Sequence, residues 1–145
     1  MVDTGLVLRT RHVPGCLLAL RVVAGGIFIA HGAQKLFTFG LANVAQSFAG
    51  MGVPMPGIMG PAVAFLEFFG GILLVAGLLT RVWAILLGLN MIGAIVLVHW
   101  KNGFWNSNSG IEFPLALLGM CFALALTGGG PWSLDAILPP RRINS

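Results

Sequence analysis

Residues 16–37 read CLLALRVVAGGIFIAHGAQKLF, an almost unbroken run of apolar and small side chains. A helix needs about 20 such residues, rising about 1.5 Å each, to cross the roughly 30 Å of hydrocarbon in a bilayer. The run therefore predicts a membrane-spanning helix. It also contains the ionisable side chains of Arg21, His31 and Lys35, so the rest of the sequence has to supply partners for them.

Three further apolar runs follow at 61–79, 82–99 and 111–127. Over the 145 residues, 57% are hydrophobic and only 8% are charged, and the mean hydropathy is +0.95. Roughly a quarter of the residues in a soluble domain are charged, so this is the composition of a membrane protein. A lipid-exposed backbone must form its hydrogen bonds internally. We therefore expect an all-α fold, a four-helix transmembrane bundle that makes one integral-membrane domain over residues 1–145, without a nucleic-acid partner.

Two shorter elements are predicted outside these runs. The connection at 38–60 contains LANVAQSFAG, whose apolar residues recur at helical spacing, which favours a short interfacial helix. Pro61 suits the first turn of the helix that follows. After the fourth run, GGGPWSLDAIL at 128–138 breaks the helix and predicts a short amphipathic helix with Trp132 as an interfacial anchor.

The positive charges are unevenly distributed between the two ends of the predicted bundle. One end carries Arg9, Arg11, Arg81, Arg141 and Arg142, and the other carries Lys35 and Lys101. The positive-inside rule then predicts that both termini are cytoplasmic and that the connections at 38–60 and 100–110 lie outside. The first run is too long for a secretory signal, so we expect it to remain in the mature chain.

Five titratable side chains are predicted at the outer end of the bundle. His31 and Glu67 lie at the same depth, about 9 Å below that end by helical rise, on neighbouring antiparallel helices. We expect these two to face each other. Lys35 follows His31 by one helical turn, His99 closes the third run and Glu112 opens the fourth. A carboxylate in hydrocarbon costs about 2.5 to 3.5 kcal/mol, so Glu67 in particular requires a partner.

Structural interpretations compete with a functional one for three of these residues. Lys35 can simply extend its ammonium to the outer interface. Ser109 and Glu112 have the spacing of a capping box at a helix N-terminus. His99 stands near a helix C-terminus, where a cationic side chain is favoured. Glu67 and His31 are less easily explained in this way, because they lie deeper.

Two polar residues fall outside this cluster. Arg21 lies about 15 Å below His31 by helical rise, and we expect it to reach either the inner interface or Asp135 as a structural contact. Asn90 is about 180° around its helix from His99, which predicts a separate contact for it.

Small residues recur on single faces of the predicted helices and favour close packing within the chain over a dimer interface. The pairs are Gly26 and Ala30, Gly70 and Gly77, and Ala84 and Gly88. Cys16 and Cys121 have no metal-type or redox-type spacing and are interpreted as buried thiols.

Four stretches together resemble the DoxX family of small bacterial inner-membrane proteins, over about residues 17–138. These stretches are LALRVVAGGIFIAHGAQKLF, FLEFFGGILLVAGLLTR, GIEFPLALL and GGGPWSLDAIL. By the family's Arg, His-Gly-x-x-Lys and Glu pattern, the positions carried over are Arg21, His31, Gly32, Lys35, Glu67, His99 and Glu112. The resemblance implies a four-helix protein of the bacterial cytoplasmic membrane, linked to quinone-dependent oxidation such as that of thiosulfate, or to membrane oxidoreductase complexes.

Three hypotheses for the cluster follow. In the first it is a quinone site, where His31 and Glu67 exchange protons with the quinol as catalytic groups and Lys35, His99 and Glu112 bind the ligand. The electrons would go to a partner subunit, because no haem, flavin or iron–sulfur motif is recognisable. In the second, the chain is a non-catalytic accessory subunit of a larger respiratory or other energy-converting complex.

The third hypothesis is a metal site. It would consist of His31, Glu67, His99 and Glu112, whose donor atoms suit zinc or a redox metal. The nearby ammonium of Lys35 disfavours this, and we expect no metal. A transporter is also disfavoured, because four helices without broken segments or inverted repeats offer little alternating access.

Overall fold

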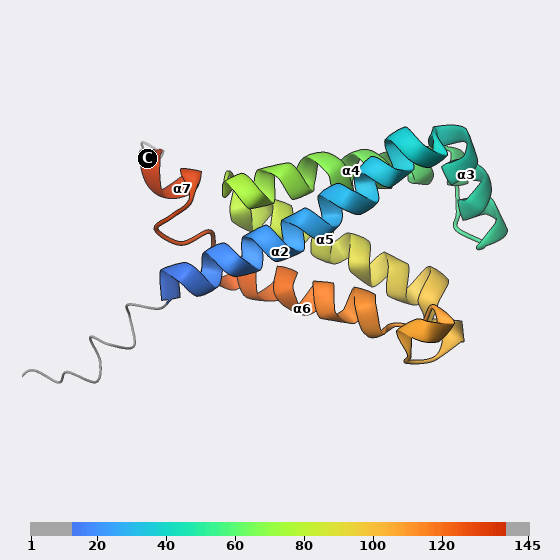
Figure 1. Cartoon of the computed structure of the whole chain (residues 1–145). Helices are drawn as coiled ribbons and strands as arrows, with labels where there is room; N and C mark the ends of the chain where they lie inside the picture. The colour runs from blue at the N-terminus through green and yellow to red at the C-terminus, as the bar shows by residue number, and fades with distance from the viewer. Residues whose placement is uncertain (1–12, 139–145) are drawn as a thin grey trace, which may run out of the picture.

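The computed structural model describes residues 13–138, which are helical and contain no strand. The longer helices run lengthwise along the molecule, each antiparallel to the long helix that follows it in the chain (Figure 1). The elements are α2 (Val13–Ala33) with its π-helical continuation η1 (Gln34–Phe39), α3 (Leu41–Gly50), α4 (Pro56–Ala76), α5 (Thr80–Ala94) with the π-helical η2 (Ile95–His99), the 3-10 turns η3 (Trp100–Asn102) and η4 (Asn106–Asn108), α6 (Glu112–Thr127) and α7 (Leu134–Ile137). The all-α prediction is confirmed, as are short helices in the first connection and after α6.

Three of these helices are long and apolar enough to cross a membrane. They are Val13–Phe39, Pro56–Ala76 and Thr80–Asn102. The fourth, α6, is apolar but has 16 residues, which reach about 24 Å at about 1.5 Å per residue. The helices occupy the predicted runs, and a fourth full span remains a prediction because α6 is shorter than the hydrocarbon layer.

The ends of α4 differ from the predicted ones for local reasons. Pro56 occupies the first turn, where its missing N–H is not needed, so Pro61 lies inside the helix and the expectation that it begins the helix is wrong. At the other end Gly77 adopts a φ of 73° and its N–H donates to Leu73 O at 2.9 Å. A glycine in this left-handed conformation ends a helix at low cost.

The first helix pair is α2 and α4, whose backbones cross at three glycines. A Cβ on Gly25 would lie 2.7 Å from Gly71 O, and one on Gly32 would lie 2.4 Å from the Phe68 nitrogen. These backbone atoms leave no room for any side chain larger than hydrogen. The predicted close-packing pair Gly26 and Ala30 is instead exposed, so the crossing uses the neighbouring helix face.

The second pair, α5 and α6, contacts the first through a shared apolar core. Gly88 of α5 packs near Cys121 of α6, as the small-residue pattern predicts. Cys121 is buried, whereas Cys16, near the start of α2, is exposed, contrary to expectation. The core comprises Leu17, Ala24, Phe28, Leu74, Ala84, Leu87, Met91, Leu117, Cys121 and Leu124.

One end of the bundle, which we call the α7 end, is closed by Arg21. Its side chain is only 1% exposed, and it donates hydrogen bonds to Val75 O at 3.1 Å and Trp132 O at 2.6 Å. The guanidinium therefore joins α2 to the end of α4 and to the segment before α7. It does not extend to the interface, and within residues 13–138 no ion pair joins it to Asp135.

Asp135 is used differently from the prediction, because its carboxylate caps α5. The two oxygens accept the N–H groups of Leu79 at 2.6 Å and Thr80 at 2.9 Å, while the Asp135 N–H donates to Gly77 O at 2.9 Å. Burial alone would raise the pKa of this carboxyl. The hydrogen bonds from Thr80 and Leu79 and the positive charge of Arg21 outweigh burial and hold the pKa below 3.8.

This cap predicts acid sensitivity at the α7 end. Because the pKa of Asp135 is lower in the folded than in the unfolded chain, the unfolded state binds more protons in acid and stability falls with falling pH. The stabilisation should be complete above the ordinary value of 3.8 and disappear as the pH falls below it towards the folded-state pKa. Thermal unfolding in detergent at about pH 6 and about pH 3 should show a smaller pH effect for Asp135→Asn than for the unchanged protein. Equal acid sensitivity of both proteins would contradict this role.

At the opposite end, which we call the α3 end, the two helix pairs diverge (Figure 1). Nearer the α7 end α4 and α5 touch, since a Cβ on Gly70 would lie 3.2 Å from the Trp83 ring and 3.4 Å from Leu87. Towards the α3 end the pairs separate, and α3 packs its buried Val44 near Gly60 of α4. The divergence leaves space between the pairs at the α3 end.

Candidate functional site

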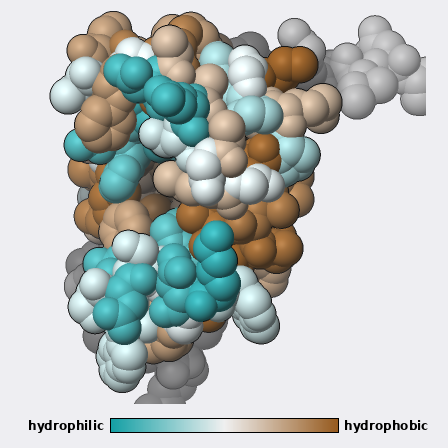
Figure 2. Space-filling model, turned by 90° about the vertical axis from the view of Figure 1, so that its right-hand side faces the viewer, coloured by the Kyte–Doolittle hydropathy of each residue, from teal (hydrophilic) through white to brown (hydrophobic). Residues whose placement is uncertain are grey.

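The space between the diverging helix pairs is a cavity of about 710 Å³. Residues of α2, α4, α5 and α6 line it, and α3 and the connection before α6 border its outer rim. Most of the lining is apolar, but it also contains polar residues. His31, Lys35, Glu67, Asn90 and His99 lie on the long helices and their continuations, and Asn106 and Ser109 lie in the connection before α6. Figure 2 looks onto this end and shows hydrophilic residues in separate areas beside hydrophobic surface.

Glu67 is the central polar residue of the cavity. It is 5% exposed and both of its carboxylate oxygens are used. Lys35 Nζ donates to Oε2 and forms an ion pair with it, and Asn90 Nδ2 donates to Oε1 at 3.0 Å. A buried carboxylate requires such compensation. The interaction joins α4 to the end of the first helix and to α5.

His31 lines the same cavity without contacting Glu67. Its side chain is exposed, and its ring centroid lies 5.7 Å from that of Phe113 on α6. Among the described residues, no hydrogen bond or ion pair joins His31 to Glu67. The expected facing pair is therefore replaced by Lys35 and Glu67, and His31 lies at the side where α2 meets α6.

His99 and Glu112 make contacts within the connection between α5 and α6. His99 Nδ1 lies 2.6 Å from Ser109 O, and because a carbonyl oxygen only accepts, Nδ1–H donates this hydrogen bond. Glu112 Oε2 accepts the Asn106 N–H at 2.8 Å. Glu112 does not line the cavity, and no side-chain cap hydrogen bond forms at the start of α6, so the capping box is not formed.

The local helix type explains why α-helical spacing predicted the wrong partner for Glu67 and left Asn90 out of the cluster. Lys35 lies in η1 and His99 in η2, and both segments are π-helical. A π-turn contains more residues than an α-turn, so it changes the angular offset between His31 and Lys35 and between Asn90 and His99. Asn90, placed outside the cluster by α-helical spacing, is in fact part of it. Its only sequence signal was an amide in the middle of an apolar run.

The geometry does not support a metal centre. No group of three or more His, Cys, Asp or Glu side chains is placed to hold an ion anywhere in residues 13–138. Lys35 already occupies one oxygen of Glu67, which leaves that carboxylate poorly suited to a cation. The metal hypothesis for His31, Glu67, His99 and Glu112 therefore gains no support from the structure.

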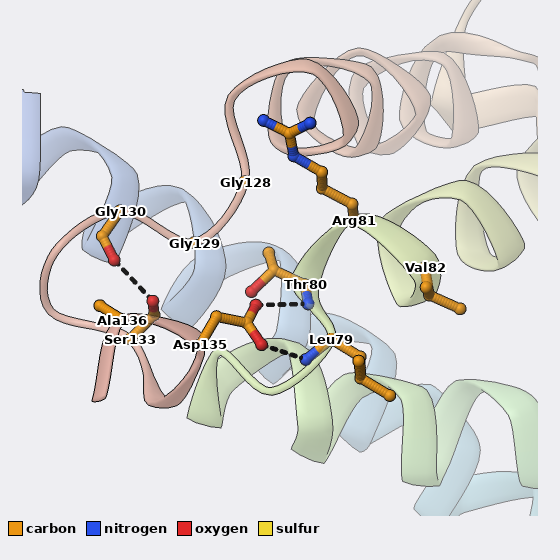
Figure 3. A pocket seen from close by; sticks show the side chains of 10 residues that line it. All are labelled: Leu79, Thr80, Arg81, Val82, Gly128, Gly129, Gly130, Ser133, Asp135 and Ala136. Atoms are coloured by element: carbon orange, nitrogen blue, oxygen red, sulfur yellow. Dashed lines mark hydrogen bonds between the residues drawn. The ribbon is translucent and has the colours of Figure 1, made fainter. Parts of the chain in front are cut away.

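A second cavity, of about 430 Å³, lies at the α7 end. Figure 3 shows that the Asp135 carboxylate there binds the backbone of Leu79 and Thr80, while Arg81 extends away from it. A Cβ on Gly128 would lie 3.3 Å from Arg81 Nε. Because Asp135 already serves as the anion at the start of α5, this cavity is better explained as part of the cap than as a binding site.

Comparison with known proteins places the chain in a group of membrane proteins. It is 38% identical over 118 residues to "Putative oxidoreductase CatD" of Bacillus subtilis, covering 81% of this chain and 83% of the relative. It is 33% identical over 125 residues to inner membrane protein YqjF of Escherichia coli, covering 84% and 91%. A Mycobacterium tuberculosis membrane protein, Rv3486, is 32% identical over 139 residues, covering 88% and 84%.

No solved structure matches the chain. The DoxX family model matches residues 16–100, which include the helices that carry Lys35, Glu67, Asn90 and His99. With this match and relatives that share most of their length with it, the chain is a member of the DoxX family of membrane proteins.

Proposed function

We propose that this protein binds the head of a quinone or quinol in the α3-end cavity and exchanges its protons, as the membrane component of a quinone-linked oxidoreductase. The observation that carries the proposal is the joining of Glu67 to both Lys35 and Asn90 at one wall of a largely apolar cavity. The name of the Bacillus relative, which calls it an oxidoreductase, supports the reaction class.

The cavity fits a quinone head in size and chemistry. Its volume of about 710 Å³ lies within the range of about 300 to 1,000 Å³ that is usual for small-molecule sites. A quinone head is an apolar ring with two oxygens that accept hydrogen bonds, and a quinol carries hydroxyls that also donate. Lys35 and Asn90 supply N–H donors, Glu67 supplies an acceptor, and Phe113 supplies an aromatic surface beside His31.

The residues of the cavity are arranged for proton exchange. A bound quinol supplies two protons and two electrons on oxidation. Lys35 and Asn90 both donate hydrogen bonds to the Glu67 carboxylate, and its oxygens accept a proton from the quinol when either donor turns towards the ligand. Lys35 has 19% of its side chain exposed, and His31 is exposed at the same cavity, so both provide a route for protons out of the cavity. The electrons pass to a redox partner with a metal or flavin centre.

Binding of quinone should depend on Glu67 and be insensitive to Glu112. We expect Glu67→Gln to weaken binding of a short-chain quinone to the purified protein by about tenfold or more, which corresponds to about 1.4 kcal/mol. Glu112→Gln changes a carboxylate at the same end that lies outside the cavity lining and should leave binding unchanged. Equilibrium dialysis in nanodiscs measures both. Equal affinity in Glu67→Gln and the unchanged protein would contradict the proposal.

An accessory role is the second candidate, because the same contacts also hold three helices together. Lys35, Glu67 and Asn90 join the first, second and third long helices at the α3 end, where the helix pairs otherwise diverge. In this alternative the cluster stabilises a subunit of a larger membrane complex without binding a ligand. Neutralising Lys35 and Glu67 together separates the two roles, as the Discussion describes.

We also propose that the α3 end faces the outside of the bacterial cytoplasmic membrane. Arg81 lies at the α7 end of α5 and Lys101 at the α3 end, so these two connections carry one positive charge each. The excess of positive charge that favours the cytoplasmic side comes from the arginines at 9, 11, 141 and 142, which precede α2 and follow α7 in the sequence and lie outside the described residues. With this orientation, protons from the cavity leave on the outer side.

A further inference from the structure

The α3-end cavity is bounded differently on its two flanks. On the flank between α2 and α6, the His31 and Phe113 rings lie 5.7 Å apart. Behind them Phe28 and Leu117 are 1% and 3% exposed. Aromatic and aliphatic side chains from both helices therefore pack against one another along this flank.

The flank between α4 and α5 is open to the lipid side of the bundle. The lining residues there include Ala62 of α4 and Leu86, Leu89 and Leu97 of α5, all of them exposed. Leu89 is 58% exposed although it lines the cavity. Gly93 lies between Leu89 and Leu97 on the same face, and a Cβ on it would meet no atom within 4 Å. A missing side chain thus widens this flank at its middle.

The opening has a defined inner end. A Cβ on Gly70 would lie 3.2 Å from the Trp83 ring, so α4 and α5 are in contact there. One helical turn nearer the α3 end, Asn90 donates to Glu67. The polar group that the proposed function uses therefore stands at the inner end of an apolar passage between two helices.

From these observations we infer that the α4–α5 flank is the entrance of the cavity, and that its ligand is a membrane-resident quinone whose hydrocarbon tail lies between α4 and α5. This inference rests on the proposed function. The head reaches Glu67 and Asn90, and the tail passes Gly93 and Ala62 into the bilayer. A quinone without a tail has no apolar chain to bury along this passage. A hydrocarbon tail is stabilised there, because the apolar lining removes its surface from water.

The rim towards the aqueous side supports entry from the lipid. Phe48 and Met51 of the α3 region border it, and His99 is held to Ser109 O across the connection before α6. Asn102 Nδ2 donates to the same carbonyl at 3.1 Å. Two hydrogen bonds thus fix the connection over this side, while no hydrogen bond or ion pair among the described residues crosses the α4–α5 flank beyond Glu67 and Asn90.

Filling the flank tests the inference. Gly93→Trp and Ala62→Trp each place a large ring in the passage from opposite helices and leave Glu67, Lys35 and Asn90 unchanged. Gly119→Trp is the matched control, because Gly119, like Gly93, is a helical glycine with no atom within 4 Å of a Cβ, but it is exposed and does not line the cavity. The probes are a benzoquinone or naphthoquinone head without a tail and the same head with a four-unit isoprenoid tail, bound to the full chain in nanodiscs.

We expect both flank variants to weaken binding of the tailed quinone by about tenfold or more while changing that of the tailless head by less than about threefold. Gly119→Trp should bind both as the unchanged protein does. Unaltered affinity of both flank variants for the tailed quinone would overturn the entrance while leaving the proposed function intact. An equal loss of affinity for the tailed and the tailless quinone would show that the tail does not lie in the α4–α5 flank. Failure of the unchanged protein to bind either probe would overturn the proposed function itself.

Discussion

Replacing Glu67 alone with methionine is expected to lower the free energy of unfolding by about 3–5 kcal/mol, whereas Lys35→Met with Glu67→Met should recover most of that loss. The single change leaves the Lys35 ammonium, only 19% of whose side chain is exposed, without its partner. The double change removes both charges and leaves two apolar side chains of similar length in an apolar wall. Unfolding by added sodium dodecyl sulfate in mixed micelles measures the difference.

The double variant also separates the two candidate functions. If the Lys35–Glu67 pair only holds helices together, Lys35→Met/Glu67→Met should remain folded and keep whatever assembly the unchanged protein has, and neither protein should bind the quinone. If the pair receives the quinone head, the variant should remain folded and lose quinone binding. Glu112→Met, which removes a carboxylate that accepts a single backbone N–H, is the control and should cost no more than about 1 kcal/mol. A double variant as unstable as the single one would show that the ion pair is not what compensates Lys35.

The second large effect is expected at the α7 end, where Gly77→Ala should cost about 2–5 kcal/mol. The left-handed φ of 73° at this position strains any residue with a Cβ by about 1–2 kcal/mol. The added methyl would also lie 2.0 Å from Arg21 Nη1 and 2.5 Å from Ser133 Cβ, and overpacking of this kind costs about 1–3 kcal/mol. The methyl displaces the guanidinium from Val75 O, so one substitution disturbs α2, α4 and the α7 segment together.

The matched control for Gly77 is expected to act in the opposite direction. Gly26 lies in the middle of α2, and a Cβ there would meet no atom within 4 Å. Gly26→Ala should therefore stabilise the helix by about 0.5–1 kcal/mol, because glycine is the poorer helix former. Thermal unfolding of the two variants in one detergent gives the comparison. A loss of less than about 1 kcal/mol in Gly77→Ala would mean that Arg21 moves aside freely.

The helices themselves were predictable from the sequence, because membrane-length apolar runs have few alternatives. Their ends and contact faces were less so. Pro56 and Pro61 both suit the first turn of a helix, and which of them begins α4 depends on where α3 ends and how it packs on α4. Gly25 and Gly26 are adjacent, and only the crossing with α4 determines which of them must lack a side chain. Such choices depend on tertiary contacts that hydropathy patterns do not contain.

The composition of the cavity was partly predictable for a similar reason. Helical rise placed His31, Lys35, Glu67 and His99 near one end, and all four line the cavity there. The pairing within the cluster was not predictable, because it depends on the π-helical segments that contain Lys35 and His99. Asn90 was placed outside the cluster because α-helical spacing puts it on the opposite side of its helix from His99. Glu112 was placed in the cluster only because it lies at the same end of the bundle. The depth of a residue along its helix follows from counting residues, whereas the direction of its side chain depends on the local helix type.

The burial of Arg21 has a consequence for the order in which the protein is made. Its two hydrogen-bond acceptors, Val75 and Trp132, follow it by 54 and 111 residues. The second bond cannot form until α6 and the segment behind it have left the ribosome. Until then the arginine of the first inserted helix has to be solvated by lipid headgroups or water. Closure of this end is therefore a late event of biogenesis, after all the apolar helices have been synthesised.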